Sequence, residues 1–300
     1  MRRRFTTLDV FTSRRFAGNP LAVVRDAEGL DDAEMQTIAR EFNLPETVFV
    51  LTAKGTGHRA KLRIFTTAME LPFAGHPTVG AAVLLGCMSG YNGRAHHMVL
   101  EETIGLVHCA VTPEGKEHGH ASFVIPRLPE KLDALSDIAA IAAALGLDES
   151  DIGFGAYEPA LWSAGVPVNF VPVRDLDVIA RAKPDGTYFT NVFGRNGPSI
   201  AYLFCGETIA PDHQFHARMF APALGIPEDP ATGAAAAAFA GVLAEAGGLG
   251  TGEHSYAIEQ GYEMGRPSLI ELGMTTQDGM LTRATIGGAA VIVTDGHIEA

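Results

Sequence analysis

The sequence is poor in cysteine, and nothing pairs the few cysteines it has. Cys87, Cys109 and Cys205 are an odd number, and no two of them form a C-x-x-C pair. The sequence therefore predicts no disulfide framework. A protein of this kind is expected in a reducing compartment, so the expected location is the cytoplasm.

Segments that would enter or cross a membrane are also lacking. The polar start of the chain, residues 1–5, is too short for a signal peptide. The longest uncharged apolar stretch, residues 231–244, consists mostly of small residues and falls short of the ~20 residues that a membrane span needs. We therefore expect no membrane partner.

Positive charge is scarce. The chain has 22 Lys and Arg against 35 Asp and Glu, which gives a net charge of −13. This balance argues against nucleic acid or an anionic membrane surface as a partner. It does not argue against a small anionic substrate, because helix N-termini supply local positive potential on an acidic protein.

What the sequence does contain is a repeat. Arg63-Ile64-Phe65 and the later His76-Pro77-Thr78-Val79-Gly80 correspond to Arg218-Met219-Phe220 and Asp229-Pro230-Ala231-Thr232-Gly233. The arginines are 155 residues apart (218 − 63), and His76 and Asp229 are 153 apart (229 − 76). A looser match joins residues 18–24 to residues 165–171. A repeat of half the chain length indicates duplicated domains.

A chain of 300 residues with 47% hydrophobic content suits two domains of ordinary size. We place the first at residues 1–125, with residues 287–300 as a candidate completion, and the second at 128–286. Residues 126–132 read as a linker.

Capping and turn signals predict helices over residues 31–42, 78–87, 136–145 and 232–246. Strands are expected over residues 5–11, 21–24, 47–51, 62–65, 98–101, 106–111, 120–124, near 162, and over 169–173, 188–193 and 200–204. The helices after the two repeated turns are apolar on every face, so protein must surround them. The fold class is therefore α+β or mixed α/β, each domain a curved, mostly antiparallel sheet around one central helix. Consecutive strands that outnumber the helices exclude a Rossmann fold.

The repeated turns carry the first candidates for chemistry, His76 and Asp229. A proline at the first helical position would hold the preceding residue extended beside free backbone N–H groups. Such an oxyanion nest next to a titratable side chain suits proton transfer. The alternative is structural: Asp229 caps a helix and His76 is an ordinary turn residue. Because both copies place a proton-carrying group at the same point, we favour a site, with the two helix starts directed at one cleft.

Glu46 is the third candidate. It follows Pro45 and enters the apolar strand Thr47-Val48-Phe49-Val50. Burial penalises a charged carboxylate and favours its protonated form, which suits a general acid/base near neutral pH. The alternative is a glutamate at an exposed strand end.

At this point a family resemblance can be stated. The sequence resembles the PhzF family, the phenazine-biosynthesis-like isomerases related to diaminopimelate epimerase. The resemblance rests on Phe16-Ala17-Gly18-Asn19-Pro20, Asn43-Leu44-Pro45-Glu46-Thr47, Pro72-Phe73-Ala74-Gly75-His76-Pro77-Thr78, Glu228-Asp229-Pro230-Ala231-Thr232-Gly233, Gln260-Gly261 and Gly265-Arg266-Pro267-Ser268.

The resemblance implies two pseudo-symmetric β-barrel domains around central helices, a homodimer, and no metal or organic cofactor. In the phenazine enzyme a glutamate shuttles a proton in the isomerisation of trans-2,3-dihydro-3-hydroxyanthranilate. Carried over, that glutamate matches Glu46, with His76 and Asp229 as its partners. The substrate-binding positions expected around them are Gly75, Pro77, Gly233, Ala234 and Asn19.

Two positions depart from the family pattern. Pro45 stands where the family often has serine before the glutamate, and Ala234 stands where it usually has a serine that contacts substrate. The phenazine substrate itself is therefore not the expected one, whereas the proton-transfer machinery is complete.

Competing interpretations of the sequence have less support. Five histidines cluster in residues 96–120 without a recognised ligand spacing, which favours a surface hairpin over a metal site. Gly153-Phe154-Gly155 lacks the remainder of a dinucleotide fingerprint. Neither repeated turn contains a thiol, which argues against a cysteine-based racemase. Two functional alternatives stay open: an epimerase that uses Glu46 and Asp229 on opposite faces of one carbon, and a non-catalytic ligand-binding member of the fold.

Overall fold

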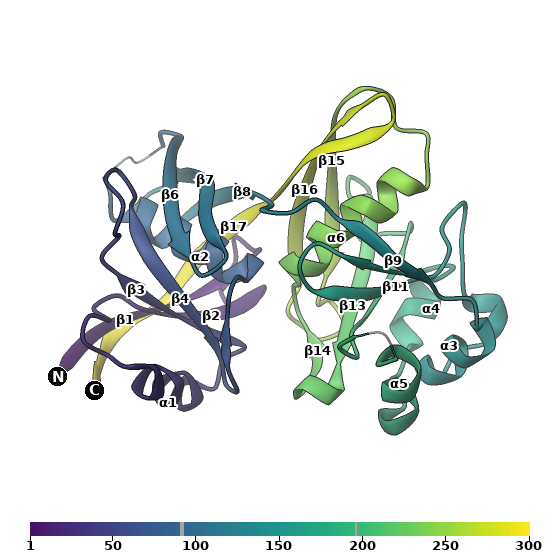
Figure 1. Cartoon of the computed structure of the whole chain (residues 1–300), viewed down its shortest axis with the longest axis horizontal. Coiled ribbons are helices and arrows are strands. Elements are labelled where there is room, and N and C mark those ends of the chain that lie inside the picture. The colour runs from purple at the N-terminus through teal and green to yellow at the C-terminus, as the bar shows by residue number, and fades with distance from the viewer. Residues whose placement is uncertain (91–92, 196) are drawn as a thin grey trace. The chain divides into compact units, whose positions relative to one another are not determined.

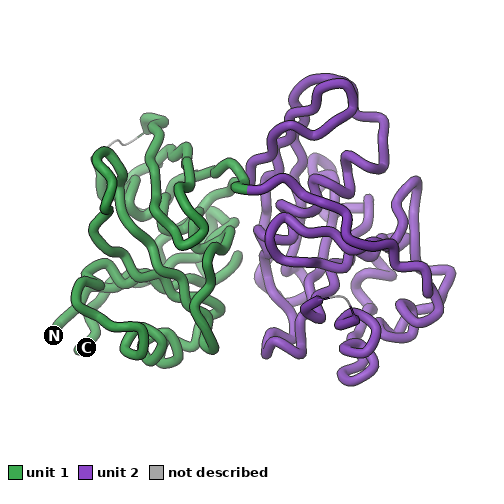
Figure 2. The backbone as a smooth tube through the Cα atoms, viewed as in Figure 1, with its two compact units in different colours: residues 1–126, 287–300 green, residues 127–286 purple. Residues whose placement is uncertain are grey.

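The computed structural model describes residues 1–90, 93–195 and 197–300. The chain forms two compact units, one of residues 1–126 and 287–300 and the other of residues 127–286 (Figure 2). The long last strand, β17 (Met280–Glu299), begins in the second unit and ends in the first. In the described residues, no helix is long and apolar enough to cross a membrane.

The first unit is a closed barrel. Its strands are β1 (Arg2–Val10), β2 (Asn19–Val24), β3 (Glu46–Leu51), β4 (Ala60–Thr66), β6 (His96–Glu102), β7 (Gly105–Pro113) and β8 (His118–Val124), together with the end of β17. Each pairs with the next in the order β1, β2, β3, β4, β6, β7, β8, and β17 closes the ring against β8 and β1. The β2–β3 and β4–β6 pairs are parallel, and the other pairs with a described register are antiparallel. The short β5 (Glu70–Leu71) adds to β4.

The second unit repeats this strand order. Its strands are β9 (Glu130–Ala134), β10 (Ala160–Ser163), β11 (Pro167–Pro172), β12 (Ala201–Cys205), β13 (Phe215–Ala221), β15 (Gly252–Gln260) and β16 (Ser268–Gln277), followed by the start of β17. The parallel pairs again stand at the same places, β11–β12 and β13–β15. A short β14 (Ile226–Asp229) adds to β13 as β5 does to β4. The expected fold class, a mixed α/β barrel around a helix in each unit, is confirmed.

One apolar helix fills each barrel, labelled α2 and α6 in Figure 1. Every residue of α2 (Gly75–Cys87) except Cys87 is buried, and α6 (Gly233–Glu245) is nearly as enclosed. In the second barrel, Phe239 of α6 packs against the rings of Phe170, Phe204 and Phe215. The expectation that protein surrounds both helices is therefore confirmed, and burial of these apolar surfaces is what holds each barrel to its helix.

At Gly241, the absence of a side chain allows α6 to pack closely against Trp162 of the barrel. A Cβ on Gly241 would lie 2.4 Å from Cζ3 of Trp162 and 3.0 Å from Cβ of Pro129. We expect Gly241→Ala to lower the free energy of unfolding by about 1–3 kcal/mol, because the rigid indole cannot give way. Alanine's better helix propensity, ~1 kcal/mol, offsets only part of this loss. Denaturant unfolding measures the change.

Gly250→Ala is the matched control, because a Cβ at Gly250 meets nothing within 4 Å. A higher unfolding midpoint for Gly241→Ala than for Gly250→Ala would show that the contact with Trp162 relaxes without cost, leaving only the gain in helix propensity.

Outside the barrels, the remaining helices cover the sheets. They are α1 (Asp32–Phe42) in the first unit and α3 (Ile138–Leu145), α4 (Leu176–Arg181) and α5 (Gly186–Phe193) in the second. Asp31 caps α1 with a reciprocal bond to Glu34, as the acidic first turn predicts. Two expectations were wrong, and one helix was not anticipated. Residues 188–193 form part of helix α5 rather than a strand, because Phe189 and Phe193 lie one helical turn apart and pack together in the core. Residues 130–132 of the expected linker belong to β9, and α4 has no counterpart in the expected elements.

Each barrel uses the same ion pair to secure its short added strand. Arg63 of β4 binds both carboxylate oxygens of Glu70, and Arg218 of β13 binds both of Glu228. Each guanidinium also lies over a phenylalanine two residues further along, with carbon-to-centroid distances of 5.1 Å and 4.7 Å. The two arginines begin the matching blocks Arg63-Ile64-Phe65 and Arg218-Met219-Phe220. The repeat therefore preserves both the ion pair and the contact of the guanidinium with the phenylalanine ring.

Candidate active site

Glu46 and His76 meet inside the first unit. Glu46 is the first residue of β3, beside Leu21 of the parallel strand β2, and His76 is the second residue of α2. Nε2 of His76 lies 3.3 Å from Oε2 of Glu46, and the two side chains are only 6% and 13% exposed. Two of the three residues expected to carry the chemistry are therefore in contact, in a place with little water.

His76 is held as a neutral ring. Burial lowers its pKa to about 3, against the smaller opposite effect of a hydrogen bond to the backbone of Pro20. Because proline has no N–H, this bond needs a ring N–H that donates to the Pro20 carbonyl. The remaining nitrogen of a neutral ring, Nε2, then presents a lone pair to Glu46.

This tautomer sets the condition for a hydrogen bond between the two side chains. A lone pair on Nε2 and a carboxylate oxygen 3.3 Å away attract each other only if a proton lies between them. If the carboxyl group of Glu46 carries that proton, Nε2 of the neutral imidazole is its acceptor. A carboxyl group that carries a proton in a sheltered site is what general acid catalysis requires.

Asp229 has its own setting in the second unit. It is the last residue of β14, is 9% exposed, and accepts a hydrogen bond from the hydroxyl of Thr232. Gln260, fully buried at the end of β15, donates to the Asp229 carbonyl at 2.8 Å and to Oγ1 of Thr232 at 3.0 Å. Because the Thr232 hydroxyl donates and is itself held by Gln260, the Asp229 carboxyl is oriented as an acceptor.

Gln260 is a residue that sequence reasoning did not place in the site. Its amide closes a ring of bonds: Nε2 reaches Asp229 and Thr232, while Oε1 accepts from the Thr232 backbone N–H at 3.2 Å. The sequence did contain a signal for this residue, the Gln260-Gly261 pair. The pair contributed to the family resemblance, but no role was assigned to it. A Cβ on Gly261 would meet Pro230 O at 2.6 Å, so the backbone passes very close to the Asp229-Pro230 turn.

A network of buried charges supports this strand end. Glu259 has its oxygens 2.8 Å from Nδ1 of His213 and 2.7 Å from Nδ1 of His216, and the other nitrogen of His216 lies 3.0 Å from Glu263. The pKa of His216 rises to about 9, because its two carboxylate partners outweigh the opposing effect of burial. In spite of burial, hydrogen bonds from His216, from the Ile209 and Ala210 backbone and from His213 lower the pKa of Glu259 to about 2. A charged His216 between two carboxylates thus fixes the strand that carries Gln260.

The two helix starts differ from the expected geometry. Prolines were expected at the first helical position, but α2 begins at Gly75, which makes Pro77 its third residue. In the second unit Pro230 precedes the helix, which has Thr232 as its N-cap and Gly233 and Ala234 as its first residues. His76 is therefore helical, whereas Asp229 ends a strand, and the expectation that both sit at the same point of the same turn was wrong. A longer connection between Arg218 and its ion-pair partner, 10 residues against 7, accompanies the difference.

Both helix starts leave backbone donors unused by side chains. Neither N-cap residue makes a side-chain cap bond, and neither first turn contains an acidic residue. In α2 the first backbone bond to the N-cap comes from Thr78, so the N–H groups of Gly75 and His76 have no intrahelical acceptor. In α6 the same holds for residues 233–235. Each start therefore offers N–H groups and a positive dipole end to an anion.

The other expected residues have separate roles. Asn19 is fully buried at the start of β2, next to Pro20, whose carbonyl orients His76. The space at Gly80 is filled by packing, since a Cβ there would meet Leu21 at 2.6 Å and Val10 at 2.8 Å. The second unit has no glutamate at the position equivalent to Glu46. Thr47 pairs with Ala22 and Phe65, as Ala201 pairs with Asn169 and Phe220, so the counterpart of Glu46 is Ile200.

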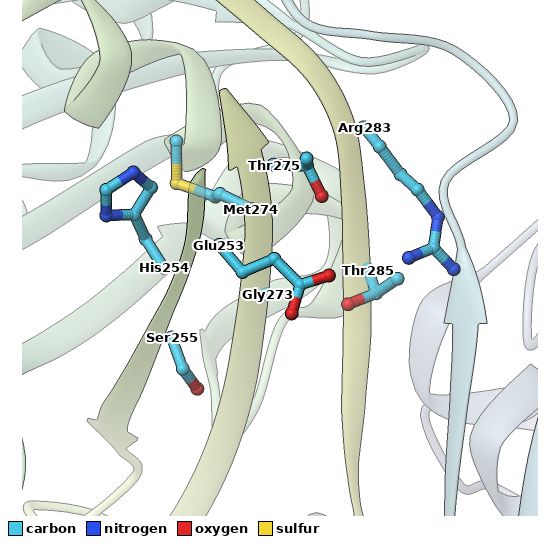
Figure 3. Close-up of a pocket in the computed structure, with 8 residues that line it drawn as sticks. All are labelled: Glu253, His254, Ser255, Gly273, Met274, Thr275, Arg283 and Thr285. Atoms are coloured by element: carbon cyan, nitrogen blue, oxygen red, sulfur yellow. The ribbon is translucent and has the colours of Figure 1, made fainter. Parts of the chain in front are cut away.

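A hollow of the second unit lies elsewhere. It measures about 250 Å³ on strands β15 to β17 and is lined by Glu253, His254, Ser255, Gly273, Met274, Thr275, Arg283 and Thr285. In Figure 3 the Glu253 carboxylate points toward Thr285, and none of the expected site residues lines the hollow. Exposed side chains such as Glu253 and Arg283 make it a polar surface depression. Within the described residues, no group of three or more His, Cys, Asp or Glu side chains is placed to hold a metal ion.

A family assignment now follows from comparison with known proteins. The model of the family described as phenazine biosynthesis-like protein matches residues 8–296. The chain belongs to this family. It is 47% identical over 299 residues to an uncharacterized isomerase of Mesorhizobium japonicum. That alignment covers 99% of this chain and 98% of the relative. It is 33% identical over 297 residues to the trans-2,3-dihydro-3-hydroxyanthranilate isomerase of Pseudomonas fluorescens, with 98% of each covered.

Solved structures agree with the family assignment. A PhzF family protein of Bacillus anthracis superposes with a TM-score of 0.87 at 26% identity, with both chains fully covered. A hydroxyproline epimerase of Agrobacterium vitis shares the fold, with a TM-score of 0.61 at 14% identity over 99% of this chain and 92% of that one. The chain is therefore an isomerase of the PhzF family, with the fold that the sequence resemblance implied.

Proposed function

We propose that this isomerase moves a proton between two atoms of a small carboxylate-bearing substrate, with Glu46 as the group that carries the proton. The observation that supports it most is the contact of Glu46 with a neutral His76 whose other nitrogen is held by Pro20. Glu46 gives its proton to one atom of the substrate and takes a proton from another. The pair ends with the single proton with which it began, so the reaction is an isomerisation without net proton uptake.

His76 has a supporting role in this scheme. While Glu46 is protonated, the lone pair on Nε2 accepts from it, and this fixes the direction in which the carboxyl group points. When Glu46 has given up its proton, the buried imidazole resists protonation, because its pKa lies near 3. The proton is then recovered from the substrate rather than from the ring.

Asp229 is proposed as the second polar partner of the substrate. Thr232 and Gln260 orient its carboxyl as an acceptor, so it suits a substrate group that donates a hydrogen bond or loses a proton. The N–H groups at the starts of α2 and α6, on Gly75 and on residues 233–235, suit the substrate's carboxylate or an enolate oxygen. Proline at 77 leaves α2 one such donor fewer.

We infer that the substrate differs from that of the phenazine enzyme. The Pseudomonas fluorescens relative named for trans-2,3-dihydro-3-hydroxyanthranilate is 33% identical to this chain. Ala234, the second residue of α6, stands where the family usually has a serine, so the site has one hydroxyl donor fewer. The absent neutral hydrogen bond corresponds to ~0.5–1.5 kcal/mol.

A deuterium screen tests the proposal. The protein is incubated in D₂O with a panel of cyclic and amino carboxylic acids that includes trans-2,3-dihydro-3-hydroxyanthranilate. Mass spectrometry then measures how much deuterium each acid has gained. We expect at least one acid to gain deuterium at carbon, and Ala234→Ser to bring little gain with the phenazine substrate. A tenfold gain on that substrate would show that the pocket is otherwise built for it, and the absence of exchange into any bound acid would favour a non-catalytic binding protein.

We also propose that the protein works as a homodimer in the cytoplasm, with a small anionic molecule as its partner. The family resemblance supports the dimer, and the acidic composition supports the choice of partner class. Light scattering should give about twice the chain mass of 31.7 kDa. A mass equal to that of one chain at micromolar concentration would refute the dimer.

A further inference from the structure

A buried glutamate lies behind the first turn of α2, and nothing in the proposed reaction uses it. Glu102 is the last residue of β6 and is 7% exposed. Its Oε1 lies 2.8 Å from Oγ1 of Thr78, two residues beyond His76. Its Oε2 is buried and makes no hydrogen bond to any described residue.

A count of hydrogens limits how Thr78 can bond to Glu102. Oγ1 of Thr78 also lies 2.7 Å from the carbonyl oxygen of Ala74, the N-cap of α2. Oxygens at such distances need a hydrogen between them, and a carbonyl oxygen has none to give. Thr78 has one hydroxyl hydrogen, so it cannot donate to both oxygens. If it donates to Ala74, the second hydrogen must come from Glu102.

The surroundings of Glu102 fit a neutral carboxyl group. Burial raises its pKa to about 8, although the bond to Thr78 acts in the opposite direction. The titratable group that faces it from β7 is the uncharged thiol of Cys109. The charged neighbour Glu101 is engaged elsewhere, with the His58 ring and the Lys54 and Gly55 backbone. An ionised Glu102 would thus leave a buried carboxylate oxygen without a hydrogen-bond donor or a positive charge beside it.

We propose that Glu102 is a positioning residue: in its neutral form it donates to Thr78, which frees the Thr78 hydroxyl to hold the Ala74 carbonyl and so fixes the first turn of α2. That turn carries Gly75 and His76, so the position of the Nε2 lone pair facing Glu46 depends on it. The turn between β6 and β7 is tied to the same motif, because the Ile104 N–H donates to the Pro72 carbonyl at 2.9 Å. The activity readout rests on the proposed function, whereas the stability and exchange readouts do not.

Loss of the Glu102 proton has a defined consequence. The Thr78 hydrogen would turn to the carboxylate, and the Ala74 carbonyl would keep only the Thr78 backbone N–H, at 3.2 Å. The sign of the pH effect follows from the raised pKa. The stability contribution is complete below the unfolded value of about 4.5 and is lost as pH rises through about 8. The first turn should therefore loosen under mildly alkaline conditions.

The first experiment is a pH–rate profile of deuterium exchange into an accepted acid. We expect the parent rate to fall above about pH 8. Glu102→Gln, whose amide donates to Thr78 but does not titrate, should remove this fall. Glu102→Ala, which lacks the donor, should be slower by about 3- to 10-fold at pH 7, and the glutamine should rescue most of that loss. An alkaline fall of equal midpoint in the parent and in Glu102→Gln would overturn the proposal.

The second experiment uses the free protein and needs no substrate. Thermal unfolding and hydrogen exchange at the Thr78 amide are compared for the parent and Glu102→Gln between pH 6 and 9.5. We expect Glu102→Gln to gain relative stability, and its Thr78 amide to gain relative protection, as pH rises. If this holds while no acid exchanges deuterium, the proposed function fails and the positioning role stands. If acids exchange and the two proteins show parallel pH curves, the positioning role fails and the proposed function stands.

Discussion

Glu46→Gln is expected to slow deuterium exchange into substrate by about 10²- to 10⁴-fold, the usual loss when a general acid/base is removed. The amide keeps the shape of the side chain and can still donate to Nε2 of His76 across the 3.3 Å contact, so the protein should fold normally. It cannot give up and regain a proton, and the reaction therefore loses its carrier. Exchange rates by mass spectrometry, at saturating acid, measure the effect.

Glu41→Gln is the matched control for this variant. Glu41 lies on the neighbouring helix α1 and is exposed, so the same Glu-to-Gln exchange is made there without touching the site. We expect its exchange rate to equal that of the parent. If Glu46→Gln also exchanged at the parent rate, Glu46 would have to be reassigned as a structural residue of β3.

Asp229→Asn is expected to lower turnover by a similar ~10²- to 10⁴-fold if Asp229 acts on a substrate proton. The amide oxygen of asparagine can still accept from the Thr232 hydroxyl, and Gln260 can still hold the Asp229 carbonyl. What the variant removes is the negative charge. Steady-state kinetics separate the possibilities, because a lower kcat indicates a role in proton transfer, whereas a higher KM alone indicates a role in binding.

Asp212→Asn serves as the control, since Asp212 is 84% exposed and lies in the same unit. The double variant Glu46→Gln with Asp229→Asn extends the test. Residues that act on one substrate molecule as a unit give a double loss much smaller than the product of the single losses. A fully multiplicative loss would show that the two residues work independently of each other.

Much of the fold followed from the sequence because its signals were local. An apolar helix of 13 residues with no polar stripe has to be enclosed, whatever surrounds it, and α2 and α6 are enclosed. Capping residues such as Asp31 and the β-branched runs of β2 and β3 act over a few residues, so they marked their elements well. Helix α5 was missed because an apolar aromatic run is compatible with either period, and only the contact of Phe189 with Phe193 in the folded core selects the helix.

The helix starts illustrate a different limit. A proline after His76 or Asp229 is compatible with the first helical position, but equally with the third or with a place before the helix. The choice depends on where β5 and β14 end, and this in turn depends on the length of chain between each arginine and its glutamate. That length differs between the units, so similar motifs adopt different local structures.

By itself, the sequence determined which residue types are available and which family they belong to: Glu46, His76 and Asp229 are recognisable from motifs that lie close to them along the chain. Only the tertiary structure decided the tautomer of His76 and the orientation of Asp229. The Pro20 carbonyl selects the tautomer of His76, Gln260 turns Asp229 into an acceptor, and Glu102 completes the hydrogen bonds of Thr78. These partners are 56, 31 and 24 residues away along the chain (76 − 20, 260 − 229 and 102 − 78). A proton's position depends on distances of a few ångströms between such groups and on their burial, and both arise only when the barrel closes around its helix.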